Sequence, residues 1–476
     1  MPSKKLATLL HALSGHDLNR FRKFLSSPYF NEHQELVILL DLLINASDES
    51  LEDSAARKKA IWKKIFNKKA YNDGYMRRLI SELIRLLLSF MALERYRKNP
   101  IQEQLLLLDL LNEPAYQLHF AGVLRNSETL QEKSNFRDSY FHFYQYLLDE
   151  QLYKYIEKSD RNPEMLKNLE DADYHLDCYY ITKKLQHYCD ALGYRNFLPV
   201  EENINLPPDF MNWLQQSAYI KEPAVKSYFL VAQLFLHPDE SSFYYELKNL
   251  LKEKGHLFQI NELKAIYIHL INYCIDIKIN KGFTDFFDEL FDIYKNMLAE
   301  NVLIENNMID PQHYKLIISV GLQVNEFDWV KDFIQTYTEK LPPEEQANAR
   351  IYNLAKVHFQ QQDYDKVIEL LREVEYENIT YALGGKLMLL KTYYELNEFL
   401  ALDSLIDSFR IYLRRNRFIS KEVRQQYLNV LRFVKKLSNT HPKDQEAIAK
   451  VRQEIDACKA LADKNWILQK LEDLSS

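Results

Sequence analysis

The chain has 476 residues and a mass of 56.8 kDa, several times what one buried core requires, so two or three structural units or one long repeat array are expected. Only 9 residues are glycine and 14 are proline, which disfavours folds that need many tight turns. Apolar residues at 47% and charged residues at 27% are typical of a packed soluble protein and exclude a largely disordered chain.

Charge is unevenly distributed along the chain. The net charge is −7, but residues 1–98 contain 18 Lys and Arg against 11 Asp and Glu, so this segment carries +7 and the remainder −14. The total is too mild to indicate a partner by itself. The basic segment 1–98 is therefore the part of the composition that bears on binding.

Cysteines and apolar segments bear on the compartment. Four cysteines lie far apart without a CxxC pair, which favours reduced thiols in a cytoplasmic protein. They are Cys178, Cys189, Cys274 and Cys458. The first residues resemble a secretory leader, but their leucines recur at helical spacing and no small-residue cleavage site follows. The most apolar window, Leu83 to Leu93, contains Arg85 and is far shorter than the ~20 residues of a bilayer crossing, so we expect no membrane segment.

Helical periodicity runs from one end of the sequence to the other. Ser14 is a predicted N-cap with Asp17 in the first turn, and a later helix is predicted from Tyr75 to about Arg95. Strand signals are almost absent, because the single Asp-Gly pair lies between two helical patterns. The sequence therefore predicts an all-α fold.

Four regions are expected. A proline-containing stretch with few periodic residues marks the best candidate boundary; its prolines are Pro199, Pro207, Pro208 and Pro223. The regions are a basic helical N-terminal module (1–98), an aromatic-rich helical middle region (99–223), degenerate repeats (224–410) and a C-terminal helical cap (411–476). In the last region Ser420 is the predicted N-cap of a helix that continues through Leu437.

The repeat is the most informative feature. Short polar breaks followed by an aromatic residue recur at intervals of 35 to 44 residues, with the aromatics at Phe243, Phe283, Phe327, Tyr364 and Phe399. If each aromatic opens the second helix of a hairpin, the residue seven positions later should be apolar. Those residues are Leu250, Leu290, Ile334, Leu371 and Ile406. Helix pairs of this kind must stack to bury their apolar stripes, which predicts a solenoid with a concave face.

Residues 351–371, IYNLAKVHFQQQDYDKVIELL, resemble a tetratricopeptide (TPR) repeat, and the looser resemblance covers 227–410. It implies a superhelix of antiparallel helix pairs whose groove holds a peptide, helix or partner domain. Large residues such as Ile318 and Leu390 stand where the family has small ones at the helix crossing, which implies wider spacing. Residues 21–31, FRKFLSSPYFN, resemble bacterial helical-repeat proteins, and that likeness implies no function.

Motifs for catalysis or cofactor binding are missing. There is no GxGxxG, GxSxG or HExxH, and Gly384-Gly385-Lys386 lacks the rest of a phosphate-binding loop. The densest group of ligand-type residues comprises Asp173, His175, Asp177, Cys178, His187, Cys189 and Asp190. Because Cys189 lies ~16 Å along a straight helix from Cys178, one zinc ion cannot bridge the two pairs, and ordinary helix packing is favoured. We expect no enzyme, no cofactor, no metal and no small-molecule substrate.

The basic segment 57–98 holds 13 Lys and Arg against three acids. Two helices around a short turn could present such residues to phosphates. The candidate nucleic-acid contacts are Lys64, Lys68, Arg77, Arg78 and Arg85. A solvated face is the commoner role of a charge run, as is docking on the acidic remainder of the chain.

Two other groups could contact a partner. The aromatic segment 140–155 could anchor a peptide, although aromatics at helical spacing are more often core. The same caution applies to Arg410, Arg414, Arg415 and Arg417. The sequence thus favours a non-enzymatic scaffold or adaptor that binds a protein or peptide, and the alternative is a nucleic-acid-associated regulator.

Overall fold

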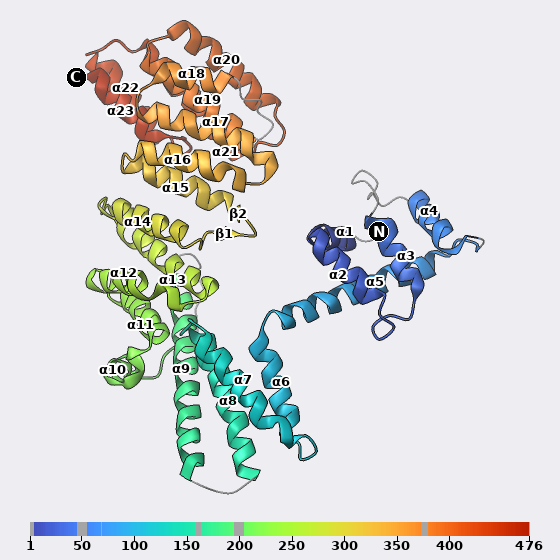
Figure 1. Ribbon diagram of the computed structural model, residues 1–476. Coiled ribbons are helices and arrows are strands. Elements are labelled where there is room, and N and C mark those ends of the chain that lie inside the picture. The colour runs from blue at the N-terminus through green and yellow to red at the C-terminus, as the bar shows by residue number, and fades with distance from the viewer. Residues whose placement is uncertain are drawn as a thin grey trace. The chain divides into compact units, whose positions relative to one another are not determined.

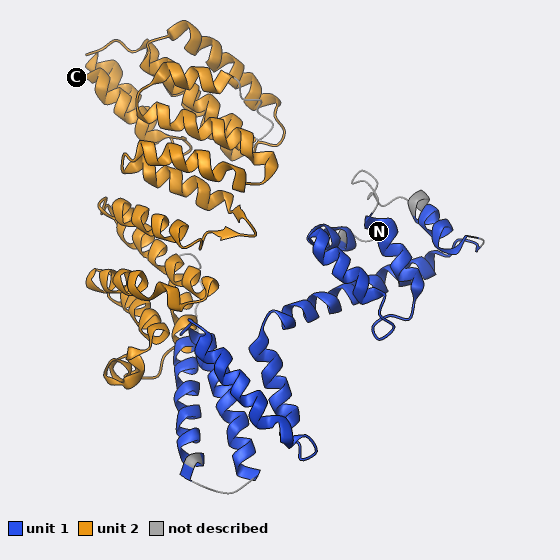
Figure 2. Ribbon diagram, viewed as in Figure 1, with its two compact units in different colours: residues 1–183 blue, residues 184–476 orange. Residues whose placement is uncertain are grey.

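The computed structural model describes residues 4–44, 55–67, 69–158, 163–194, 204–372 and 379–475. Over the part that the structure describes, the protein is 81% helical, with 23 α-helices and almost no strand, so the predicted all-α class is confirmed. The chain forms two compact units, residues 1–183 and 184–476 (Figure 2), and the division falls inside helix α9. The finer division into four regions stays a prediction.

Unit 1 contains two clusters of buried apolar residues. The first joins α1 to α5, with Phe21, Leu39, Leu83 and Phe90 at its centre. The second joins α6 to α8 around Leu108, Phe120 and Leu148. The helices are α1 Lys4–His11, α2 Gly15–Leu25, α3 Gln34–Ile44, α4 Ala55–Phe66, α5 Asp73–Arg97, α6 Pro100–Leu111, α7 Phe120–Lys133, α8 Ser139–Lys158 and α9 Pro163–Tyr194 (Figure 1), with a 3₁₀ turn at Gln117–His119.

Local capping explains where these helices start. The predicted N-cap Ser14 accepts a hydrogen bond from the backbone N–H of Asp17 at 3.1 Å. Helix α5 begins at Asp73, two residues before the predicted start, because the side chain of Asn72 caps the N–H of Tyr75 at 2.9 Å. In unit 2, the predicted cap Ser420 likewise accepts from Val423 at 3.2 Å.

Unit 2 is a succession of helices in which neighbours along the chain pack on each other. After α10 (Phe210–Gln216) come five pairs and three further helices (Figure 1). They are α11 Pro223–Leu236, α12 Ser242–Lys254, α13 Ile260–Asn272, α14 Phe286–Ala299, α15 Pro311–Gln323, α16 Phe327–Tyr337, α17 Pro343–Gln360, α18 Tyr364–Arg372, α19 Ile379–Glu395, α20 Phe399–Arg415, α21 Lys421–Asn439, α22 Gln445–Ala457 and α23 Lys464–Ser475. First helices of successive pairs also touch, as α11 with α13, α15 with α17 and α17 with α19.

Short helical turns and one hairpin complete unit 2. The turns are 3₁₀ at Ala218–Lys221, Gly255–Leu257, Ile279–Lys281 and Thr338–Lys340, and π at Tyr273–Lys278. Strands β1 (Ile304–Glu305) and β2 (Met308–Ile309) pair antiparallel. The two residues between them, Asn306 and Asn307, have φ of 51° and 63°, as a type I′ turn requires. The sequence analysis did not anticipate this hairpin.

The repeating aromatics stand at the starts of second helices. Phe327, Tyr364 and Phe399 are the first residues of α16, α18 and α20, and Phe243 is the second residue of α12. All five residues predicted to be apolar seven positions later are buried: Leu250, Leu290, Ile334, Leu371 and Ile406. Phe283 lies three residues before the start of α14, so the helix start predicted at this residue was wrong by three positions.

One turn geometry recurs before these helices. Asn325, Gln362 and Asn397 have φ of 61°, 60° and 57°, and the next residue in each case bonds back to a carbonyl five positions earlier. This is the Schellman arrangement that ends a helix. Gly282, with φ of 97°, makes the same turn one residue nearer to its aromatic, and a further turn at Thr284 and Asp285 precedes α14.

Candidate binding surfaces

The residues of ligand type in α9 are held by other contacts. Nδ1 of His175 lies 2.9 Å from Nδ1 of His142 on α8. The buried thiol of Cys189 donates to the carbonyl oxygen of Tyr228, and its pKa is raised by burial and then by the nearby Asp190. Asp190 in turn lies 3.3 Å from Nε2 of His269. Across the described ranges, no three His, Cys, Asp or Glu side chains are grouped as a metal ion would need.

The aromatic side chains of α8 are half-buried and partly engaged in packing. Tyr155 stacks on Phe120 with centroids 4.1 Å apart, and the hydroxyl of Tyr144 accepts hydrogen bonds from the side-chain amides of Asn99 and Gln102. Tyr140 is the exception, because it is 44% exposed. These contacts give part of the segment a packing role, and its contact with a partner stays a prediction.

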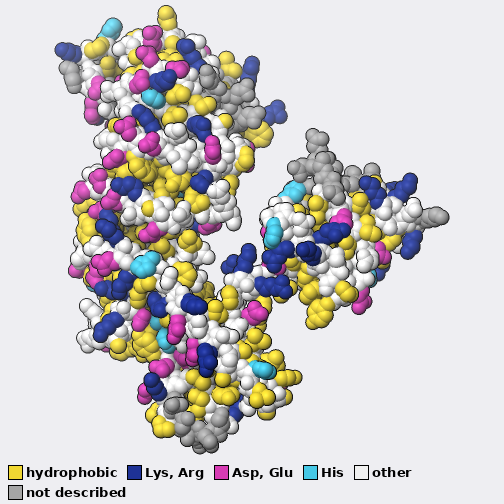
Figure 3. All heavy atoms as spheres, in the orientation of Figure 1, with side chains coloured by type: hydrophobic (Ala, Val, Ile, Leu, Met, Phe, Trp, Pro, Cys, Tyr) yellow, Lys and Arg dark blue, Asp and Glu magenta, His cyan; other side chains and the backbone are white. Residues whose placement is uncertain are grey.

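The predicted basic contacts are partly neutralised. Arg77 pairs with Asp73 at 2.5 Å and Arg85 with Glu82 at 2.6 Å, while the Arg78 guanidinium lies over the ring of Tyr75. These ion pairs are exposed and therefore weak. Figure 3 shows the Lys and Arg side chains over this part of unit 1.

The lysines of the same segment differ from these arginines in their contacts. Lys64 and its neighbour Lys63 are exposed on α4, and neither makes an ion pair with any described residue. Lys68 lies outside the described residues. The structure thus brings Arg77, Arg78 and Arg85 onto one helix, with Lys64 on the helix before it.

Membrane insertion gains no support from the helices. Within the described part of the chain, none combines the length and the apolar character that crossing a bilayer demands.

The arginines at the end of α20 form an exposed cationic group with an exposed apolar neighbour. Arg410 pairs with Asp407 at 3.0 Å. By contrast, Arg414, Arg415 and Arg417 are exposed and make no ion pair among residues 379–475 or the other described ranges. Phe418 directly follows them and is 89% exposed.

A hollow of about 640 Å³ lies at this group. Its lining residues are Ser408, Ile411, Tyr412, Arg415, Asn416, Arg417 and Phe418. We call them the α20-end surface. Two guanidinium groups and an exposed phenyl ring at one depression can bind a carboxylate and an apolar side chain together.

The turn that carries Phe418 is held in place. The guanidinium of Arg424 donates to the carbonyl oxygens of Leu413, Asn416 and Ile419 at 2.8, 2.9 and 3.1 Å. The backbone N–H of Phe418 donates to the side chain of Asn416 at 3.0 Å. Exposure of the phenyl ring is therefore built into a fixed turn, which lowers the entropy cost of binding to it.

A second cationic feature, missed by the sequence analysis, lies on first helices. Nζ of Lys356 on α17 donates to Oγ of Ser319 on α15 at 2.9 Å, and burial lowers the pKa of this lysine. Lys315 on α15 lies over the ring of Tyr381 on α19, 5.3 Å from its centroid. Neither lysine makes an ion pair with a described residue. Only a structure could find this feature, since it depends on three helices.

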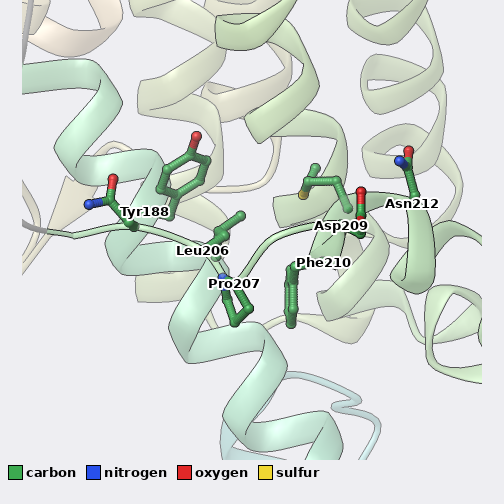
Figure 4. Close-up of a pocket in the computed structure, with 8 residues that line it drawn as sticks. Tyr188, Leu206, Pro207, Asp209, Phe210 and Asn212 are labelled. Atoms are coloured by element: carbon green, nitrogen blue, oxygen red, sulfur yellow. The ribbon is translucent and has the colours of Figure 1, made fainter.

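A smaller hollow of about 300 Å³ lies beside the start of α10 (Figure 4). Tyr188 of α9 lines it together with the segment 205–212, where Asp209 is the only charged residue. Of the predicted boundary prolines, Pro207 lines this hollow, and Pro199 lies outside the described residues. Nothing in this lining favours a particular chemistry.

Comparison with known proteins adds no assignment. No protein-family model, no curated protein and no solved structure matches this chain.

Proposed function

We propose that this protein is a non-enzymatic cytoplasmic scaffold whose helix pairs form a TPR-like solenoid and bind an acidic segment of a partner protein. The α20-end surface carries the proposal, because exposed aromatic and arginine side chains are the types enriched at protein interfaces. Packing of consecutive helices and the recurring Schellman turn support the solenoid.

The lysines on the first helices favour the same partner chemistry. A cation that is partly removed from water without an acidic partner costs free energy, and a bound carboxylate would offset that cost. Lys315 and Lys356 fit this description. An acidic segment would thus meet positive charge on both features of unit 2.

The test compares a triple variant with a matched control. Phe418→Ala combined with Arg415→Glu and Arg417→Glu removes the ring and reverses two charges, whereas Arg410→Ala removes an arginine on the same helix that Asp407 already neutralises. Each full-length protein is used to retain proteins from nuclease-treated native cell extract. We expect partners bound by the wild type and by Arg410→Ala to be lost from the triple variant. Equal retention by all three, at equal helicity, would contradict the proposal.

A second candidate function rests on Lys63 and Lys64, which are exposed on α4 without an acidic partner among the described residues. Phosphate contacts of this kind would make the protein a nucleic-acid-associated regulator through segment 57–98. Retention of duplex DNA and of RNA should then fall steeply as salt rises. It should also drop when Lys63, Lys64 and Arg78 are changed to Glu. Absence of retention at low salt would remove this candidate.

A further inference from the structure

Helix α9 carries an apolar stripe that faces solvent within unit 1. Leu166, Leu169, Leu176 and Tyr180 are 64%, 43%, 39% and 53% exposed. Most large apolar side chains of a helix this long should be buried against neighbours, so four on one line are unusual. The exposure of this apolar stripe therefore needs an explanation.

The spacing of the stripe is that of a coiled-coil seam. The intervals from Leu166 to Leu169, then to Asp173, Leu176 and Tyr180 are three, four, three and four residues, so all five positions fall on one face. Cys178 and Thr182, which are fully buried, lie on the side of the helix opposite the seam, and the buried Asn168 and Ala172 lie between the two sides. Because the seam faces away from the packed side, a second helix can lie along it.

The charges beside the seam select the partner. Asp173 occupies a seam position and is exposed, and Glu170 is exposed beside it. A second copy of α9 would bring these acids against one another, whereas Lys and Arg on an incoming helix would pair with them.

We propose that the α9 seam binds an amphipathic helix of another protein that has leucine-type residues at heptad positions and basic residues along both edges. Asp173 sets the register, because a polar residue inside an apolar seam favours the alignment that gives it a partner. A lysine or arginine of the bound helix lies opposite this carboxylate. The surface is separate from the α20-end surface and adds a second class of partner.

The probes are three synthetic helical peptides of equal length. The first has leucine at the heptad seam and lysine at the edges, the second replaces each lysine with glutamate, and the third replaces each leucine with serine. Full-length protein should bind the first and bind the other two about tenfold or more weakly. Leu169→Ser combined with Leu176→Ser should abolish binding, whereas Leu118→Ser, at a side chain that is 95% exposed in the same unit, should leave it unchanged.

Charge reversal makes the test specific. In Glu170→Lys combined with Asp173→Lys the preference should invert, so that the glutamate peptide binds and the lysine peptide does not. Equal binding of the lysine and glutamate peptides would overturn the proposal. So would a wild-type dimer in sedimentation that Leu169→Ser with Leu176→Ser converts to monomer, since the seam would then pair with its own copy.

Discussion

A β-carbon added to Gly321 on α15 would lie 2.5 Å from Cγ2 of Val330 on α16, so these helices approach as closely as a glycine allows. The nearest atom of Phe291 would be 3.3 Å away. We expect Gly321→Ala to lower the free energy of unfolding by about 1–3 kcal/mol, because crowding outweighs the gain in helix propensity. Urea unfolding followed by circular dichroism measures this change.

Gly122 provides the matched control for that substitution. It lies in α7, and no heavy atom would come within 4 Å of an added β-carbon. Gly122→Ala should therefore stabilise the protein by roughly 0.5–1 kcal/mol. The double variant Gly321→Ala with Val330→Ala should lose less free energy of unfolding than the two single variants lose in total. A gain in stability from Gly321→Ala alone would refute the close approach.

Sequence reasoning succeeded where the physical cause is local. The caps at Ser14 and Ser420 involve side chains and backbone groups three residues apart, so the sequence contains both partners. The starts at Phe327, Tyr364 and Phe399 follow from a polar turn that ends one helix just before the next. At Phe283 the predicted helix start was wrong by three residues, because the turn at Gly282 is followed by a second turn at Thr284 and Asp285 before α14 begins.

Features that depend on distant neighbours could not be predicted. The close approach at Gly321 needs α14, α15 and α16 together, and the sequence analysis had expected wider helix spacing from large residues such as Ile318. Exposure of Phe418 likewise contradicts the usual burial of phenylalanine, and its cause is a turn fixed by Arg424. The candidate binding sites of this protein were therefore identified more from the structure than from the sequence.

The left-handed turn residues offer a second stability prediction. Gln362 has φ of 60°, a conformation that costs a residue with a β-carbon about 1 kcal/mol. Gln362→Gly should raise the free energy of unfolding by roughly 0.5–1 kcal/mol, after allowing for the greater freedom of glycine when unfolded. Gln361→Gly is the control, because its φ of −80° gives glycine no advantage and should cost stability. Chemical unfolding measures the free energy of unfolding of both variants. An equal loss of stability in the two would contradict the left-handed conformation at Gln362.

Asp149 predicts how stability depends on pH. Burial, and then the nearby Asp171 and Glu128, raise the pKa of this carboxyl on α8 to about 7, against a hydrogen bond from Gln145 at 3.0 Å. The folded state then holds a proton that the unfolded state has lost. The contribution of Asp149 to the free energy of unfolding should be largest below about pH 4 and fall by roughly 2–4 kcal/mol as the pH rises to 7. Subtracting the pH profile of Asp149→Asn isolates this contribution, and a wild-type profile parallel to that of the variant would exclude it.

Lys356 gives the opposite pH dependence. Burial lowers its pKa, so between that pKa and 10.5 the unfolded state binds a proton that the folded state has released, and stability rises with pH. At pH 7 the folded state carries a charge whose one hydrogen-bond partner among the described residues is Ser319, and Lys356→Met should stabilise the protein by about 1–3 kcal/mol. The advantage should shrink as pH approaches 10.5. Lys366→Met, at an exposed lysine paired with Glu369, should change stability little. Destabilisation by Lys356→Met at pH 7 would show that the lysine has a partner that offsets its burial.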